Sequence, residues 1–190
     1  MNTVSEEGIA RINTFSKLVL KRRGDSAVEF LNAANRLYVL HFVEVVEIGD
    51  HRVMYFMLRL AEGKRGGPAD VEVGRMIVAI IVEYLKEHPD DLVCYCHVDN
   101  YLTNAINRIF HTWARDNRDL IDDYCSFFDG RGRSDNIGLH FMVIYNLACE
   151  DIAALKAFIQ ENSDDFAACV REQIALLHDI EKDLHHKQKK

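Results

Sequence analysis

The sequence predicts an α/β domain with a mixed, mostly antiparallel sheet, flanked by an N-terminal helix and a C-terminal helical extension. Three observations carry this prediction. Strand-like segments separated by turn residues fill positions 27–60, helix-like and strand-like segments alternate over positions 70–145, and the rest of the chain is amphipathic. Because 190 residues suit one domain, we expect residues 1–149 to form it and residues 150–190 to pack on it or on a partner.

The first part of the chain predicts a helix followed by three strands. Residues 3–20 have the pattern of a helix, since Thr3 and Glu6 are spaced as a capping box and apolar residues between 9 and 15 share a face. β-branched and aromatic residues then mark strands at Ala27–Leu31, 36–46 and 52–60. Gly49 and Asp50 form a turn between the last two strands, so we expect these strands to pair antiparallel.

The middle of the chain predicts a crossover unit. A glycine-rich loop precedes Asp70, which is placed to cap a helix ending near His88. Leu92–Val98 is a short apolar strand, and Asn100 or Thr103 caps the helix after it. The order strand, helix, strand, helix is typical of a parallel crossover.

The last part predicts a hairpin and two helices. Residues 124–128 and 137–145 are strands, and residues 130–133, Gly-Arg-Gly-Arg, form the hairpin tip between them. Ser163 caps the second of two amphipathic helices. Such helices gain most of their stability by burying an apolar face, so we expect residues 150–184 to be buried on the sheet or in a protein partner, with a homo-oligomer favoured.

The composition narrows the classes of function. A net charge of -7 is unsuited to nucleic acid as the main partner, and no apolar stretch approaches the roughly 20 residues of a membrane span. The N-terminus lacks the pattern of a signal peptide, so we expect a cytoplasmic protein with reduced thiols. Cys94 and Cys96 lie one residue apart on a strand, which predicts buried thiols on one face rather than zinc ligands. We expect neither a metal nor a resident cofactor.

Chemistry-bearing residues gather at the end of the Leu92–Val98 strand. His97 and Asp99 share a face of that strand, and ligands of open α/β sheets lie beyond the carboxyl ends of strands. A histidine beside a carboxylate can act as a general base near neutral pH. The alternative interpretation is structural, with Asp99 capping the next helix and His97 in the core.

The order of elements over residues 27–145 resembles the GNAT acetyltransferase fold. The stretch 73–77, Val-Gly-Arg-Met-Ile, is similar to the end of the GNAT phosphate loop entering its helix, and Asn104 with the alanine after it is similar to the family's next helix. The resemblance implies acetyl-CoA or another acyl-CoA as cofactor, with Gly74 and Asn104 among the residues that bind it.

The chain is also similar to a small bacterial family whose members have no assigned activity. The likeness covers about residues 27–147. It rests on four short matches, at Tyr84 with Pro89, Val98 with Asp99, Asn107 with Arg108, and Phe110 with Trp113. This resemblance implies a fold and no particular activity.

The sequence departs from the GNAT phosphate loop, which binds pyrophosphate through exposed backbone N–H groups. Aligned on Gly74, the loop carries Asp70 and Glu72, and each carboxylate would cost on the order of 1 kcal/mol against phosphate. The tyrosine that often serves as acid in the family falls at Phe110.

A basic glycine-rich run lies just before that loop. Lys64, Arg65, Gly66 and Gly67 could replace the missing phosphate contacts, or they form a plain connecting turn. Two hypotheses of function follow. The chain is a binding or regulatory module with a degraded acetyl-CoA loop, or it is a divergent acyl-CoA-dependent N-acyltransferase with His97 or Asp99 as base.

Overall fold

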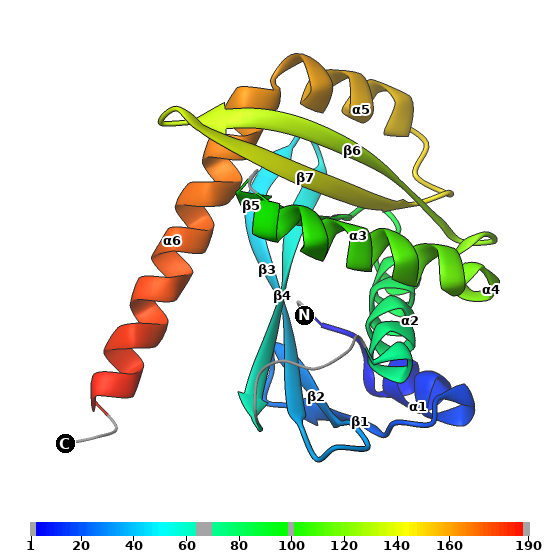
Figure 1. The fold of residues 1–190 in the computed structure, drawn as a ribbon. Helices are drawn as coiled ribbons and strands as arrows, with labels where there is room; N and C mark the ends of the chain where they lie inside the picture. Colours follow the sequence, from blue (N-terminus) through cyan, green and yellow to red (C-terminus); the bar gives the residue numbers. More distant parts are fainter. Residues whose placement is uncertain (1–2, 64–69, 99–100, 188–190) are drawn as a thin grey trace.

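A seven-stranded sheet with helices on both faces organises the chain (Figure 1). The computed structural model describes residues 3–63, 70–98 and 101–187. The strand order is β1-β2-β3-β4-β5-β7-β6, and every neighbouring pair is antiparallel except β4 with β5. The predicted combination of helices with a mixed, mostly antiparallel sheet is confirmed.

The helices and strands follow one another in a fixed order along the chain. They are α1 (Glu6–Phe15), β1 (Leu20–Arg23), β2 (Ala27–Leu31), β3 (Leu37–Ile48), β4 (His51–Glu62), α2 (Val71–Glu87), β5 (Leu92–Val98), α3 (Tyr101–Asp116), α4 (Arg118–Ile121), β6 (Cys125–Ser134), β7 (Ile137–Asn146), α5 (Ile152–Glu161) and α6 (Ser163–Lys187).

The N-terminal helix is shorter than the sequence predicts. Its N-cap is Ser5, whose hydroxyl accepts from the Gly8 N–H, so the prediction of a capping box at Thr3 is wrong. The helix ends at Phe15 because the Asn13 amide holds the chain that follows. Asn13 accepts from the Leu20 N–H at 2.8 Å and donates to the Leu20 carbonyl at 2.9 Å, which turns β1 back to pair with β2.

The sequence did not predict β1, whereas the next three strands agree with the prediction. β2 has the predicted bounds, and β3 and β4 are slightly longer than predicted. They form an antiparallel hairpin whose turn is Gly49-Asp50, with Gly49 at a φ of 61° that favours glycine. Asp70 caps α2 as predicted, accepting from the N–H groups of Glu72 and Val73.

The crossover from β4 through α2 to β5 is parallel, as predicted. The two strands pair over three positions only, Val53–Leu92, Met54–Val93 and Tyr55–Cys94. Beyond Cys94 the rest of β5 pairs with β7 and no longer with β4. The sheet therefore opens between β4 and β5 toward the carboxyl end of β5. α3 begins at Tyr101, so Thr103 is not its cap, and Asn100 lies outside the described residues.

The hairpin of β6 and β7 is longer than predicted, and the prediction of a tip at residues 130–133 is wrong. Those four residues lie within β6 and pair with β7. The turn is Asp135-Asn136, both at positive φ, as in the two-residue turns that favour Asn and Asp. Gly130 and Gly132 serve close packing, since a Cβ there would come within 2.2 Å of the Phe141 ring and within 2.1 Å of the Ser163 carbonyl oxygen.

Alternation along β5 divides the core into two layers. Val93 and Tyr95 face α2 and α3, whereas Cys94 and Cys96 face the layer of α5 and α6. Figure 1 shows α3 and α5 on opposite sides of the β6–β7 hairpin. Cys94 and Cys96 are buried on one face, as predicted, and burial raises the pKa of the Cys96 thiol to about 12.

The C-terminal helices pack on the chain's own sheet. α6 begins at Ser163, and α5 and α6 bury five apolar side chains against β6, β7 and β3, namely Leu155, Ile159, Phe166, Ala167 and Val170. Phe158 is an exception to the predicted burial, because half of it is exposed. The expected homo-oligomer stays a prediction. In the described part of the chain, no helix is long and apolar enough to cross a membrane.

Candidate functional site

His97 lies where the sequence predicts, near the carboxyl end of β5, on the face covered by α3. It is 8% exposed and stands opposite His140 of β7 in the sheet. The two rings meet edge to face with centroids 5.2 Å apart. Asp99, the other predicted base, lies outside the described residues.

Two more side chains extend this pair toward solvent. Asp129 of β6 places Oδ1 at 3.6 Å from His140 Nε2 and at 3.3 Å from His111 Nε2 of α3. We call His97, His140, Asp129 and His111 the histidine cluster. Its members become more exposed outward, from His97 and His140 inside to Asp129 and His111, whose side chains are each 37% exposed.

The distances assign donors and acceptors within the histidine cluster. His97 Nδ1 lies 3.1 Å from the Val98 carbonyl oxygen, which only accepts, so this nitrogen carries a proton. His97 Nε2 then accepts from His140 Nδ1 at 3.4 Å. The other nitrogen of His140, Nε2, lies 3.6 Å from Asp129 Oδ1, beyond hydrogen-bond distance.

This geometry limits what His97 can do chemically. A general base needs a free lone pair within reach of the substrate proton. Both nitrogens of His97 are already engaged, one by Val98 and one by His140. Asp129 and His111 are the most exposed groups of the histidine cluster, and His140 lines a hollow beside Asp129.

The N-terminus of α2 is where the GNAT resemblance implies a phosphate site. Asp70 Oδ1 accepts from the N–H groups of Glu72 at 3.0 Å and Val73 at 3.3 Å, and Asn32 donates to the other oxygen at 2.9 Å. Glu72 pairs with Lys17 at 2.6 Å. The backbone N–H groups of Glu72 and Val73 therefore already donate to a carboxylate of the chain itself.

Gly74, to which the resemblance assigns a cofactor contact, packs against Trp113 of α3. It lies in the first turn of α2, and its N–H donates to the Asp70 carbonyl. A Cβ at this position would come within 2.3 Å of Trp113 Cδ1. The glycine lets α2 and α3 approach closely enough for the indole to lie on the helix backbone.

The other residues predicted to bind cofactor cannot be placed on this site. Lys64, Arg65, Gly66 and Gly67 lie outside the described residues. Asn104 lies in α3, but its side chain is not among those described. Phe110, at the position of the family's acid, packs against Tyr95 with ring centroids 4.5 Å apart.

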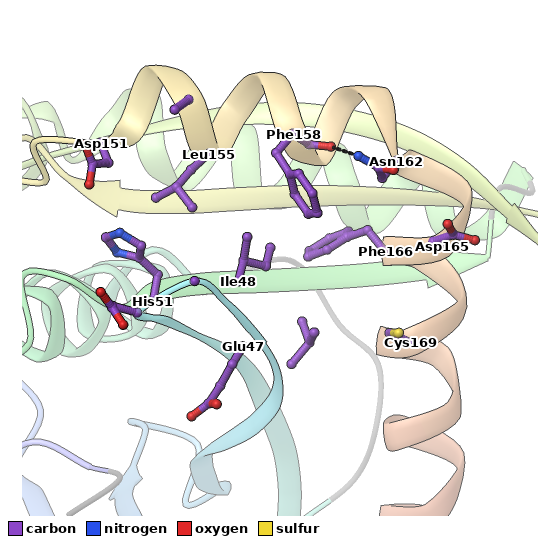
Figure 2. A pocket seen from close by; sticks show the side chains of 14 residues that line it. Glu47, Ile48, His51, Asp151, Leu155, Phe158, Asn162, Asp165, Phe166 and Cys169 are labelled. Atoms are coloured by element: carbon purple, nitrogen blue, oxygen red, sulfur yellow. Dashed lines mark hydrogen bonds between the residues drawn. The ribbon is translucent and has the colours of Figure 1, made fainter.

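A cavity of about 650 Å³ lies on the opposite side of the sheet (Figure 2). The turn between β3 and β4 forms one wall, and the bend between α5 and α6 forms the other. Figure 2 shows Ile48 and Phe158 pointing toward each other across it, with Phe166 beside them. No pattern in the sequence signals this cavity, because its walls lie about one hundred residues apart in the chain.

Sequence reasoning also missed Asp129 and His140. The pattern of residues 130–133 favoured a hairpin tip, which placed Asp129 beside a loop. Its position next to His140 of β7 could therefore not be predicted. Within the described residues, no group of three or more His, Cys, Asp and Glu side chains is arranged to hold a metal ion.

Comparisons with protein-family models, with curated proteins and with solved structures found no match to this chain.

Proposed function

We propose that this chain is a GNAT-like domain that serves as a binding or regulatory module and does not use acetyl-CoA. The GNAT part of the proposal is supported by the order of elements and by the parallel pairing of β4 and β5 inside an otherwise antiparallel sheet. The sheet opens at this junction, next to α2 and α3.

One observation carries the binding-module proposal. The carboxylate of Asp70 occupies the amides of Glu72 and Val73 that a pyrophosphate would need. A phosphate entering there would displace a cap, which typically contributes about 1 kcal/mol, and would meet the charges of Asp70 and Glu72.

A thermal shift experiment tests this proposal. Acetyl-CoA at millimolar concentration is expected to leave the melting temperature of the wild-type chain unchanged. A ligand present at a hundred times its Kd would stabilise the fold by about 2.7 kcal/mol, which such an experiment detects readily. A clear upward shift would contradict the proposal.

The second candidate is a divergent acyl-CoA-dependent N-acyltransferase. The histidine cluster favours it, because its two exposed members, Asp129 and His111, lie 3.3 Å apart and can take up a proton from an amine. If this function holds, incubating the chain with acetyl-CoA and an amine releases free coenzyme A. Asp129→Asn is then expected to slow that release, while Asp135→Asn, on the turn of the same hairpin, leaves it unchanged. No release by the wild-type chain would remove this candidate.

A further inference from the structure

We propose that the cavity between the β3–β4 turn and the α5–α6 bend binds a small organic cation, an apolar body that ends in a protonated amine. This deepens the proposed binding function, on which it rests, by naming a class of ligand. The cavity is formed by described residues and lies on the α5–α6 side of the sheet, away from α2.

The floor of the cavity is apolar. The cavity is lined by Val46, Ile48, Leu155 and Phe166. Figure 2 shows Phe158 pointing across it toward Ile48. Phe158 is 50% exposed although its neighbours on the same helix, Leu155 and Ile159, are buried. The volume of about 650 Å³ lies within the range of small-molecule sites, and an apolar body of that size would cover the Phe158 ring.

The charges around this floor are all of one sign. Among the described residues, no lysine or arginine lines the cavity. Four carboxylates do, those of Glu47, Asp50, Asp151 and Asp165. In the described part of the chain, none of the four forms an ion pair within 4.0 Å. Asp151 is the N-cap residue of α5, yet its side chain makes no capping hydrogen bond.

Nearby basic side chains are held elsewhere. Arg52 binds Asp91 with two hydrogen bonds, and Lys156 lies over the Phe128 ring at 5.5 Å. His51 donates through Nδ1 to the Asp90 carbonyl at 2.8 Å, so its Nε2 is an acceptor when the ring is neutral. The polar lining thus offers acceptors and negative charge, which suit an ammonium group and repel an anion.

Three probes with one apolar body and different ends test this inference. We expect 4-phenylbutylamine to bind the full chain in a calorimetric titration, more tightly than 4-phenylbutanol, while 4-phenylbutyrate does not bind. The Kd of the amine is expected to rise with salt, because the carboxylates are near the surface. Equal binding of all three probes, or binding of none, would overturn the inference.

Two variants and a control assign the site. The double variant Asp151→Asn with Asp165→Asn is expected to raise the Kd of 4-phenylbutylamine by roughly fivefold. The Kd of 4-phenylbutanol should stay unchanged. Phe158→Ser is expected to raise the Kd of both the amine and the alcohol. Glu161 is an exposed carboxylate of α5 outside the cavity, so Glu161→Gln is expected to leave the Kd of both probes unchanged. An equal effect of the control and the double variant would contradict this site, as would binding of a lysine-rich amphipathic peptide in place of the amine.

The same titrations separate this inference from the proposed function. Binding of acetyl-CoA would contradict the proposed function and leave the result with the amine intact. Failure of the amine to bind, with no binding of acetyl-CoA, would remove the inference alone.

Discussion

The indole of Trp113 lies against the backbone of α2 at Gly74, so closely that a Cβ on this glycine would come within 2.3 Å of Trp113 Cδ1. This contact joins the two helices that cover one face of the sheet next to β5. It also gives Gly74 a structural reason to be glycine that does not involve a cofactor.

Gly74→Ala is the direct test of that contact. In an open helix this change stabilises by about 1 kcal/mol, whereas overpacking against Trp113 is expected to destabilise by about 1–3 kcal/mol. Urea denaturation measures the difference. In a Trp113→Ala background the clash is absent, and we expect the same substitution to become stabilising. A stabilising effect in the wild-type background would contradict close packing of the indole on α2.

A buried network at the other end of α2 is expected to be costly to break. Asp91 binds Arg52 through two hydrogen bonds and accepts from the Tyr84 hydroxyl at 2.6 Å. Asp91→Asn removes the negative charge that Arg52 binds and is expected to destabilise by about 3 kcal/mol in chemical denaturation. Tyr84→Phe removes one hydrogen bond and should cost about 1 kcal/mol. Equal losses of unfolding free energy in the two variants would contradict the claim that Asp91 holds this network together.

Gly132 governs how α6 docks on β6. A Cβ there would come within 2.1 Å of the Ser163 carbonyl oxygen and 2.8 Å of the Ala167 Cβ. We expect Gly132→Ala to loosen α6, so that its amides exchange hydrogen faster in the first turns while the amides of β3 keep their protection. Arg131→Ala, on an exposed neighbour, is the control. Unchanged protection of α6 would show that the helix is held elsewhere.

The buried thiols predict a loss of stability in alkali. Burial raises the pKa of Cys96 and Cys125 from 9.0 to about 12. Between these values the unfolded chain loses protons that the folded chain keeps, so stability falls as pH rises above 9. Each thiol contributes a slope of about 1.4 kcal/mol per pH unit.

Urea midpoints measured between pH 8 and roughly pH 11 check this slope. The double variant Cys96→Ala with Cys125→Ala is expected to lose stability less steeply with pH than the wild-type chain. The same slope in both proteins would mean that other groups control the alkaline transition. At neutral pH the exposed Cys169 should be the first of the five thiols to react with a maleimide.

Local patterns predicted most of the fold. The bounds of β2 and β5 and the cap at Asp70 follow from short stretches in which composition, turn residues and capping chemistry agree. The end of α1 did not follow, because it depends on the Asn13 amide reaching Leu20. That contact joins a side chain to the backbone seven residues further along, and a pattern of apolar residues does not contain it.

The structural role of two glycines in β6 could not be predicted from the sequence. Gly130 and Gly132 have the composition of a turn, but they lie in β6 where Phe141 and α6 approach closely. The same error hid the candidate site, because the meeting of Asp129, His140 and His97 depends on the register of three strands. Register is fixed by the whole sheet, so the sequence could place His97 but not its partners.

The central claim is that the Asp70 carboxylate occupies the amides that acetyl-CoA would need. Calorimetric titration of acetyl-CoA into two proteins tests it most directly, the wild-type chain and Asp70→Ser combined with Glu72→Gly. Serine keeps a neutral N-cap on α2, so the variant removes charge without removing the cap. We expect no measurable heat of binding for the wild-type chain and weak binding for the variant. A micromolar Kd for the wild-type chain would contradict the account.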